Sequence, residues 1–201
     1  KKLASKNAAI NKLRHFYAVS RDFFAAYRTF LIPVDKRTII FESFMGSSYS
    51  DSPKAIYEQM LKDTHFKDYK FIWIFKNPDR YKDLTKNPRT TIVKYHSKEY
   101  FKAYARAEYW IVNCWISLRI KKKSSQRMIQ CWHGTPLKRL RNDIDPNVDT
   151  NHRNNDIKNN DKDASRYDYF VSPSRYATNI FKSAFNLSEL HKEDIILEIG
   201  Y

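Results

Sequence analysis

The amino-acid sequence predicts an α/β fold built on a doubly wound, mostly parallel sheet. Short apolar segments of strand length alternate with helical segments from residue 38 onward, a pattern typical of parallel sheets covered by helices. All three glycines of the chain, Gly46, Gly134 and Gly200, come soon after predicted strands. Ligands of such sheets bind at the carboxyl ends of the strands, so we expect the loops after these strands to share one crevice.

Residues 3–31 are predicted to form a basic amphipathic helix that precedes the sheet. Apolar residues recur there at helical spacing, while Arg14, Arg21 and Arg28 recur every seven residues on another face. This helix could pack on its own protein, or it could lie at a membrane surface with its arginines against anionic lipid. Residues 1–32 are therefore assigned to a helical segment and residues 33–201 to a Rossmann-like domain.

After Pro33 the predicted elements alternate. The expected helices cover residues 52–62, 97–107 and 174–185, and the expected strands cover residues 38–41, 69–75, 91–95, 109–114, 128–132, 167–171 and 194–199. The longest apolar runs, of about five residues, fall far short of the ~20 residues that a spanning helix needs. With three glycines the chain has no dinucleotide fingerprint and no P-loop, which argues against an ordinary dehydrogenase or ATPase.

The charge of the chain predicts an anionic partner. Its 37 Lys and Arg against 22 Asp and Glu give a net charge of +15, which suits nucleic acid, anionic lipid or a phosphate polymer. Nucleic acid is disfavoured, because the aromatic residues fall on predicted strands and helix faces and no nucleic-acid motif is present. Cys114 and Cys131 lack the paired spacing of a metal site, so no metal is expected, and they fit a reducing cytoplasm.

Two blocks of opposite charge are adjacent in the sequence. Residues 119–141 contain eight Lys and Arg and no acid, and residues 142–168 contain seven aspartates. We expect the acidic block to be mainly solvated loop. The basic block flanks His133, so it could bind phosphate or form a solvated surface.

The stretch around His133 carries the main candidate site. Residues 128–140 predict a buried strand, a turn at Gly134, and a basic helix that begins with Thr135 as N-cap and Pro136 in the first turn. The N-terminus of that helix, together with Lys138, Arg139 and Arg141, would form an anion site. A histidine there could take the proton of a hydroxyl that attacks phosphorus, or it could simply hydrogen-bond the turn.

Several stretches resemble the CDP-glycerol:poly(glycerophosphate) glycerophosphotransferase family, which primes or polymerises teichoic acid in Gram-positive bacteria. The matching residues are 40–44, 49–57, 130–140, 167–174 and 196–201, and the run Trp-His-Gly-Thr-Pro-Leu-Lys at 132–138 is the most specific of them. The resemblance implies the acceptor-side half of a GT-B architecture, with the donor-binding domain absent from this chain. It also implies a peripheral location on the cytoplasmic face of the cell membrane.

The resemblance implies a phosphotransfer reaction. A terminal hydroxyl of an anionic, lipid-linked glycerol-phosphate acceptor would attack CDP-glycerol, with CMP leaving and His133 as general base. Phosphate contacts would come from Gly134, Thr135, Lys138 and Arg139. Weaker candidates, for contacts with the acceptor, are Glu42, Ser43, Ser172 and Ser174. Each of these four could instead cap a helix or support the core. CDP-glycerol would be the donor substrate of the full enzyme, and the chain itself would bind no cofactor.

Two alternatives stay open from the sequence. A ribitol-phosphate transferase of the same family carries the same motif, so the polyol is undecided. A non-catalytic module that docks on a membrane or a polyanion would also explain the basic helix and the net charge of +15.

Overall fold

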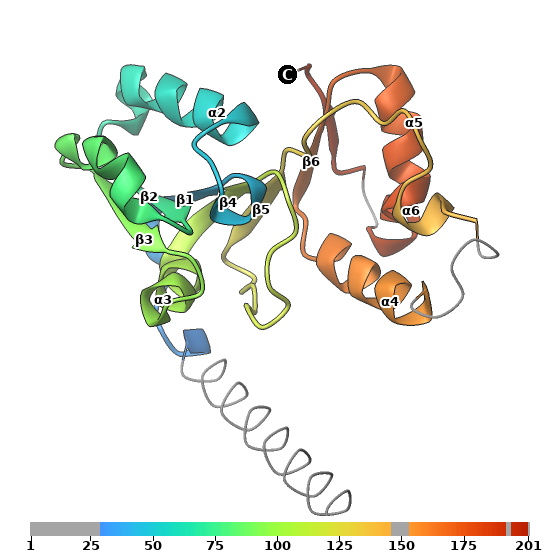
Figure 1. Cartoon of the computed structure of the whole chain (residues 1–201), viewed down its shortest axis with the longest axis horizontal. Helices are drawn as coiled ribbons and strands as arrows, with labels where there is room; N and C mark the ends of the chain where they lie inside the picture. The colour runs from blue at the N-terminus through green and yellow to red at the C-terminus, as the bar shows by residue number, and fades with distance from the viewer. Residues whose placement is uncertain (1–28, 146–152, 192–193, 201) are drawn as a thin grey trace, which may run out of the picture.

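The computed structural model describes residues 29–145, 153–191 and 194–200 (Figure 1). Arg14, Arg21 and Arg28 lie outside the described residues, so the membrane-facing role of the predicted basic helix stays a prediction.

The described residues form a seven-stranded sheet in which every neighbouring pair is parallel. The strand order is β3-β2-β1-β4-β5-β6-β7. The chain thus builds outward from β1 in one direction and then resumes on the other side of β1, which places a switch point between β1 and β4. The strands are β1 (Asp35–Glu42), β2 (Lys70–Phe75), β3 (Thr90–Lys94), β4 (Ala107–Val112), β5 (Arg127–Gln130), β6 (Tyr169–Ser172) and β7 (Ile196–Glu198). The predicted doubly wound parallel sheet is confirmed.

Helices cover both faces of this sheet (Figure 1). On one face, α2 packs against aromatic residues of β1 and β2, where the rings of Phe41 and Trp73 stack 5.3 Å apart. On the other face, Trp110 and Phe170 pack beneath α3 and α5. The α-helices are α2 (Asp51–Lys62), α3 (Lys98–Arg106), α4 (Arg153–Ala164), α5 (Arg175–Ala184) and α6 (Leu187–Leu190), and the 3-10 helices are η1 (Phe44–Gly46), η2 (Thr64–Phe66), η3 (Pro78–Lys86) and η4 (Arg141–Asp143).

The prediction of a basic helix from Thr135 is wrong. Residues 131–140 form an irregular loop, and only the short η4 follows it. Trp132 has a left-handed φ of 54° and Gly134 a φ of 141°, so the backbone turns away from the helical direction before Thr135. The Tyr176 hydroxyl then donates to the Pro136 carbonyl at 3.1 Å, which uses an acceptor that a helix beginning there would need.

The expectation that residues 142–168 form mainly solvated loop is also wrong. The helix α4 occupies Arg153–Ala164, and Asp163 is almost fully buried beside Arg166 and Tyr167. The Asn and Asp residues of this segment have poor helix propensity. Contacts with residues earlier in the chain override that local preference, since the Asn142 amide donates to Asp161 Oδ1 at 3.0 Å and Arg141 lies beside Asp163.

Candidate active site

The predicted site residues gather at the carboxyl edge of the sheet. β1 ends at Glu42, β6 ends at Ser172, and the loop with His133 follows β5. A hollow of about 550 Å³ lies at the opposite edge, near the first residues of β1, β2 and β3, and it contains none of the predicted site residues. Because ligands of doubly wound sheets bind at the carboxyl ends of the strands, beside the switch point, we expect the reaction at the carboxyl edge.

His133 lies exposed on an aromatic support. Its ring stacks on Trp132 with 4.1 Å between ring centres, and it lies 5.7 Å from the ring of Phe44 in the loop after β1. Trp132 in turn packs edge-on against Phe185 at 4.9 Å. The imidazole is thus open to solvent, while the ring beneath it is fixed by the core.

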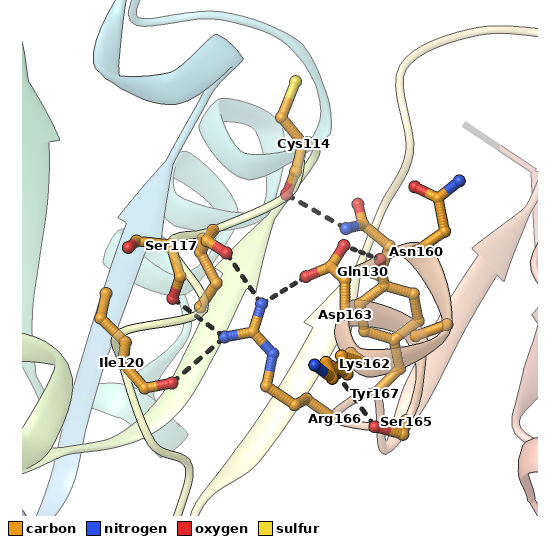
Figure 2. Close-up of polar contacts among 12 residues, drawn as sticks. Cys114, Ser117, Ile120, Gln130, Asn160, Lys162, Asp163, Ser165, Arg166 and Tyr167 are labelled. Atoms are coloured by element: carbon orange, nitrogen blue, oxygen red, sulfur yellow. Dashed lines mark hydrogen bonds and ion pairs between the residues drawn. The ribbon is translucent and has the colours of Figure 1, made fainter. Parts of the chain in front are cut away.

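Gln130 fixes the backbone that leads to His133. Its side chain is fully buried, and its Oε1 accepts a hydrogen bond from the Trp132 N–H at 2.9 Å. The Nε2 of Gln130 donates to the Cys114 carbonyl at 3.2 Å, so one side chain joins the loops that follow β4 and β5 (Figure 2). The left-handed conformation of Trp132 costs energy for a bulky residue, and this hydrogen bond helps to hold it.

Asn113 joins the loop that follows β4 to the loop that follows β1. It directly follows β4 and is fully buried. Its Oδ1 accepts from the Phe44 N–H at 2.8 Å, and its Nδ2 donates to Asp51 Oδ2 at 2.5 Å. Phe44, Met45 and Gly46 all have left-handed φ angles, of 47°, 53° and 74°. Asn113 therefore anchors a strained loop that holds Phe44 beside His133.

Neither Gln130 nor Asn113 was among the candidates from the sequence. The signal for both is a polar residue in or directly after an apolar run, since Gln130 interrupts the run from Met128 to Trp132 and Asn113 follows the run from Trp110 to Val112. A buried polar side chain at that position needs hydrogen-bonding partners, and in this fold the partners are the adjacent loops.

Glu42 is the last residue of β1 and is buried, with only 2% of its surface exposed. The Tyr104 hydroxyl donates to Glu42 Oε2 at 2.8 Å. Burial raises the pKa of Glu42 to about 8, because the loss of hydration outweighs the hydrogen bond from Tyr104 and the charge of Lys76. Near pH 7 the carboxyl group is mainly neutral and can donate a hydrogen bond. Because the group lies inside the protein, its predicted contact with an acceptor stays a prediction.

We expect Glu42→Gln to remove a pH dependence of stability. Between pH 4.5 and about 8 the unfolded chain releases the Glu42 proton while the folded chain keeps it, so the wild type loses stability as the pH rises. The loss is up to about 1.4 kcal/mol per pH unit. The neutral amide of the substituted side chain has no proton to release, so urea denaturation from pH 5 to pH 8 should show a flatter profile.

The control for this measurement is Glu189→Gln, which removes an exposed carboxyl group from α6. Its pH profile should follow that of the wild type. Parallel profiles for the Glu42→Gln and wild-type chains would contradict the buried, neutral carboxyl group.

The three candidate serines make contacts within the fold. Ser43 Oγ donates to the Ser50 carbonyl at 2.8 Å. Ser172 Oγ accepts from Thr178 at 2.9 Å and donates to the Ser174 carbonyl at 3.1 Å. Ser174 caps α5, because its Oγ accepts from the Ala177 N–H at 3.3 Å. These bonds match the capping and core-support roles, and contact with an acceptor stays a prediction.

The remaining candidates lie on the loop after His133. Thr135, Lys138 and Arg139 are exposed, and Leu137 between them is 89% exposed. A Cβ added at Gly134 would meet no atom within 4 Å, so space does not require a glycine at this position. Its φ of 141° does, because other residues rarely adopt that angle. The basic side chains are thus free to follow a phosphate along an open loop, without the helix N-terminus that the sequence suggested.

The described part of the chain offers neither a metal cluster nor a membrane-spanning helix. Within it, no three His, Cys, Asp or Glu side chains come together in a way that could hold a metal ion. None of the helices in those residue ranges has the length and apolar character needed to cross a bilayer.

Fold and site together define a Rossmann-like α/β protein with an exposed histidine beside its switch point. The family model of CDP-Glycerol:Poly(glycerophosphate) glycerophosphotransferase matches residues 24–201. The chain therefore belongs to this family, as its motifs indicated.

Relatives in the family are longer than this chain. It is 46% identical to the teichoic acid poly(glycerol phosphate) polymerase of Staphylococcus epidermidis over 84% of the chain and 22% of the relative. It is 37% identical to the teichoic acid glycerol-phosphate transferase of Staphylococcus aureus over 83% of the chain and 41% of the relative. A solved structure of the wall teichoic acid polymerase TagF is 40% identical, with a TM-score of 0.75, over 94% of this chain and 46% of that one. The chain thus spans less than half the length of each of these proteins.

Proposed function

We propose that this chain forms the acceptor side of an enzyme of teichoic acid synthesis, which transfers glycerol phosphate from CDP-glycerol to a glycerol-phosphate acceptor. The observation that carries the proposal is the exposed His133, held on Trp132 at the carboxyl edge of the sheet. The names of the relatives support the reaction, and one TagF structure was obtained after a soak with CDPG.

The reaction requires a base, an electrophile and a leaving group. The terminal hydroxyl oxygen of the acceptor attacks the glycerol-bearing phosphorus, the bond from that phosphorus to the bridging oxygen breaks, and CMP leaves with the electron pair. His133 takes the hydroxyl proton, which makes the oxygen a better nucleophile. Lys138 and Arg139 would balance the negative charge of the phosphates from the exposed loop, as phosphoryl transfer demands.

The proposal assigns acceptor binding to residues 33–201. It also includes the location of the enzyme at the membrane. An anionic, lipid-linked acceptor would hold the enzyme at the cytoplasmic face of the membrane. A net charge of +15 supports binding to such a surface. Arg14, Arg21 and Arg28 are the proposed contacts with anionic lipid, and charge reversal at all three should abolish sedimentation with anionic vesicles.

The test of the reaction is CMP release by the full-length protein that contains this sequence. CDP-glycerol is supplied with and without a lipid-linked glycerol-phosphate acceptor, and CDP-ribitol replaces it in a parallel reaction. We expect CMP only when CDP-glycerol and the acceptor are both present. Release from CDP-ribitol but not from CDP-glycerol, with the acceptor present, would instead identify a ribitol-phosphate transferase. No release from either donor would contradict the proposed transferase activity.

A further inference from the structure

A second pocket, of about 260 Å³, lies between the β4–β5 connection and α4. Figure 2 shows the two elements that flank it, the β4–β5 connection with Ser117 and Ile120 and the helix α4 with Asn160 and Asp163. Of its lining residues, only Arg141 was a candidate from the sequence, as part of the predicted anion site. The lining residues are Trp115, Leu118, Arg141, Asn159, Asn160 and Asp163.

Arg141 supplies a fixed positive charge at this pocket. Its guanidinium donates to Asn160 Oδ1 at 3.3 Å, lies 3.8 Å from Asp163 Oδ2, and packs 4.4 Å from the ring centre of Phe185. The side chain is only 14% exposed, so it is held in place. Arg141 and Arg166 both approach the single carboxylate of Asp163, and this cluster therefore keeps a net positive charge.

The other residues of the pocket suit a hydroxylated ligand. Trp115 is 48% exposed, although Trp73 and Trp110 are fully buried, so its indole offers an apolar face to the solvent side. Asn159 is exposed beside it on α4 and can both donate and accept hydrogen bonds. An aromatic face, two amides and a guanidinium match the carbon chain, the hydroxyl and the phosphate of a polyol phosphate.

The pocket is close to His133. The guanidinium carbon of Arg141 lies 5.8 Å from the ring centre of Trp132, which is 4.1 Å from the ring centre of His133. Arg141 is thus within about 10 Å of the imidazole. A chain whose terminal hydroxyl reaches His133 could place one of its preceding phosphates at Arg141.

We propose that this pocket binds an internal glycerol-phosphate unit of the acceptor chain, with the phosphate on Arg141 and the glycerol between Trp115 and Asn159. The proposal rests on the proposed function, since it takes His133 as the point where the acceptor hydroxyl reacts. It adds a subsite that positions the acceptor without touching the reacting atoms.

The first test measures binding of a short glycerol-phosphate oligomer to the 201-residue chain by NMR. The chain has four tryptophans, so Trp115→Phe identifies the indole N–H signal of Trp115. We expect the oligomer to shift that signal and the side-chain amide signals of Asn159 and Asn160. Asn159→Asp places a negative charge beside the phosphate and should weaken binding about tenfold.

The matched control is Asn179→Asp, which makes the same change on an exposed position of α5. It should bind the oligomer as the wild type does. A shift confined to other parts of the spectrum, or equal weakening by both substitutions, would overturn the pocket.

The second test compares KM values in the full-length protein. Trp115→Ala should raise the KM for the acceptor about tenfold and leave the KM for CDP-glycerol unchanged, whereas the matched change Tyr169→Ala, at a 42% exposed position of β6, should alter neither. An unchanged acceptor KM, or a rise for CDP-glycerol instead, would overturn the subsite while the transferase stands. If the wild type releases no CMP, the proposed function fails, and the NMR shifts still decide the pocket.

Discussion

Replacement of His133 with alanine is expected to slow CMP release by the full-length protein at least about 100-fold, because a positioned general base contributes roughly 10² to 10⁴ in rate. The imidazole is exposed and stacked on Trp132, so its loss removes the base without removing a core contact. Steady-state kinetics with CDP-glycerol and a glycerol-phosphate acceptor would measure the effect. The loss should fall on kcat, while the KM for CDP-glycerol stays near its wild-type value.

A matched control exists within the chain. His65 is also exposed, but it lies on η2 and pairs with Asp63 at 2.8 Å, away from the carboxyl edge. His65→Ala should release CMP at the wild-type rate. Equal rates for His133→Ala and His65→Ala would show that His133 only supports the turn, which would remove the catalytic assignment.

The largest expected effect on stability is that of Arg166→Ala. The Arg166 guanidinium donates to the carbonyls of Ile116 at 2.8 Å, Ser117 at 3.2 Å and Ile120 at 3.2 Å (Figure 2). It also pairs with the buried carboxylate of Asp163. The substitution removes the donor of three carbonyls and the guanidinium nearest to that carboxylate, which keeps only the Tyr167 hydroxyl and the more distant Arg141. We therefore expect the free energy of unfolding to fall by about 3–5 kcal/mol.

Urea denaturation of the 201-residue chain would measure this loss. Arg127→Ala is the control, because Arg127 is 47% exposed and lies 3.8 Å from Asp168, and the expected cost of that change is below about 1 kcal/mol. Asp163→Asn should also destabilise the chain, since it removes the charge that Arg166 pairs with. If Arg166→Ala cost no more than Arg127→Ala, the buried network would not be what joins α4 to the β4–β5 connection.

The sheet was predictable because its signals are local. Each strand is an apolar run, and the polar helical segments between runs set the parallel order, so the observed strands start and end within a few residues of their predicted bounds. The loop after β5 was predicted wrongly, because Thr135 and Pro136 form a good helix start only when the backbone before them permits it. The left-handed Trp132 does not.

The candidate site was predictable only in part. His133 stood out because it is a titratable residue between a strand and a glycine. The contacts of Gln130 with Cys114, and of Asn113 with Phe44, join residues far apart in the sequence. A local pattern can therefore mark the two polar residues but not their partners. The helix α4 was missed for the same reason, because Asn160 and Asp161 near its end bond to Arg141 and Asn142, which come much earlier in the chain. Arg141 was expected at the anion site beside His133, but its contacts with Asn160 and Asp163 of α4 could not be predicted from the sequence.

The bonds of Gln130 have a consequence for acceptor length. One amide holds the backbone under His133 and the carbonyl of Cys114, the residue before Trp115, so the spacing between base and pocket is built into a single rigid support. Such a support fixes the distance between the base and the pocket. A primer with a single glycerol phosphate can engage only one end of it, whereas a longer chain engages both, so we expect elongation to be favoured over the first addition.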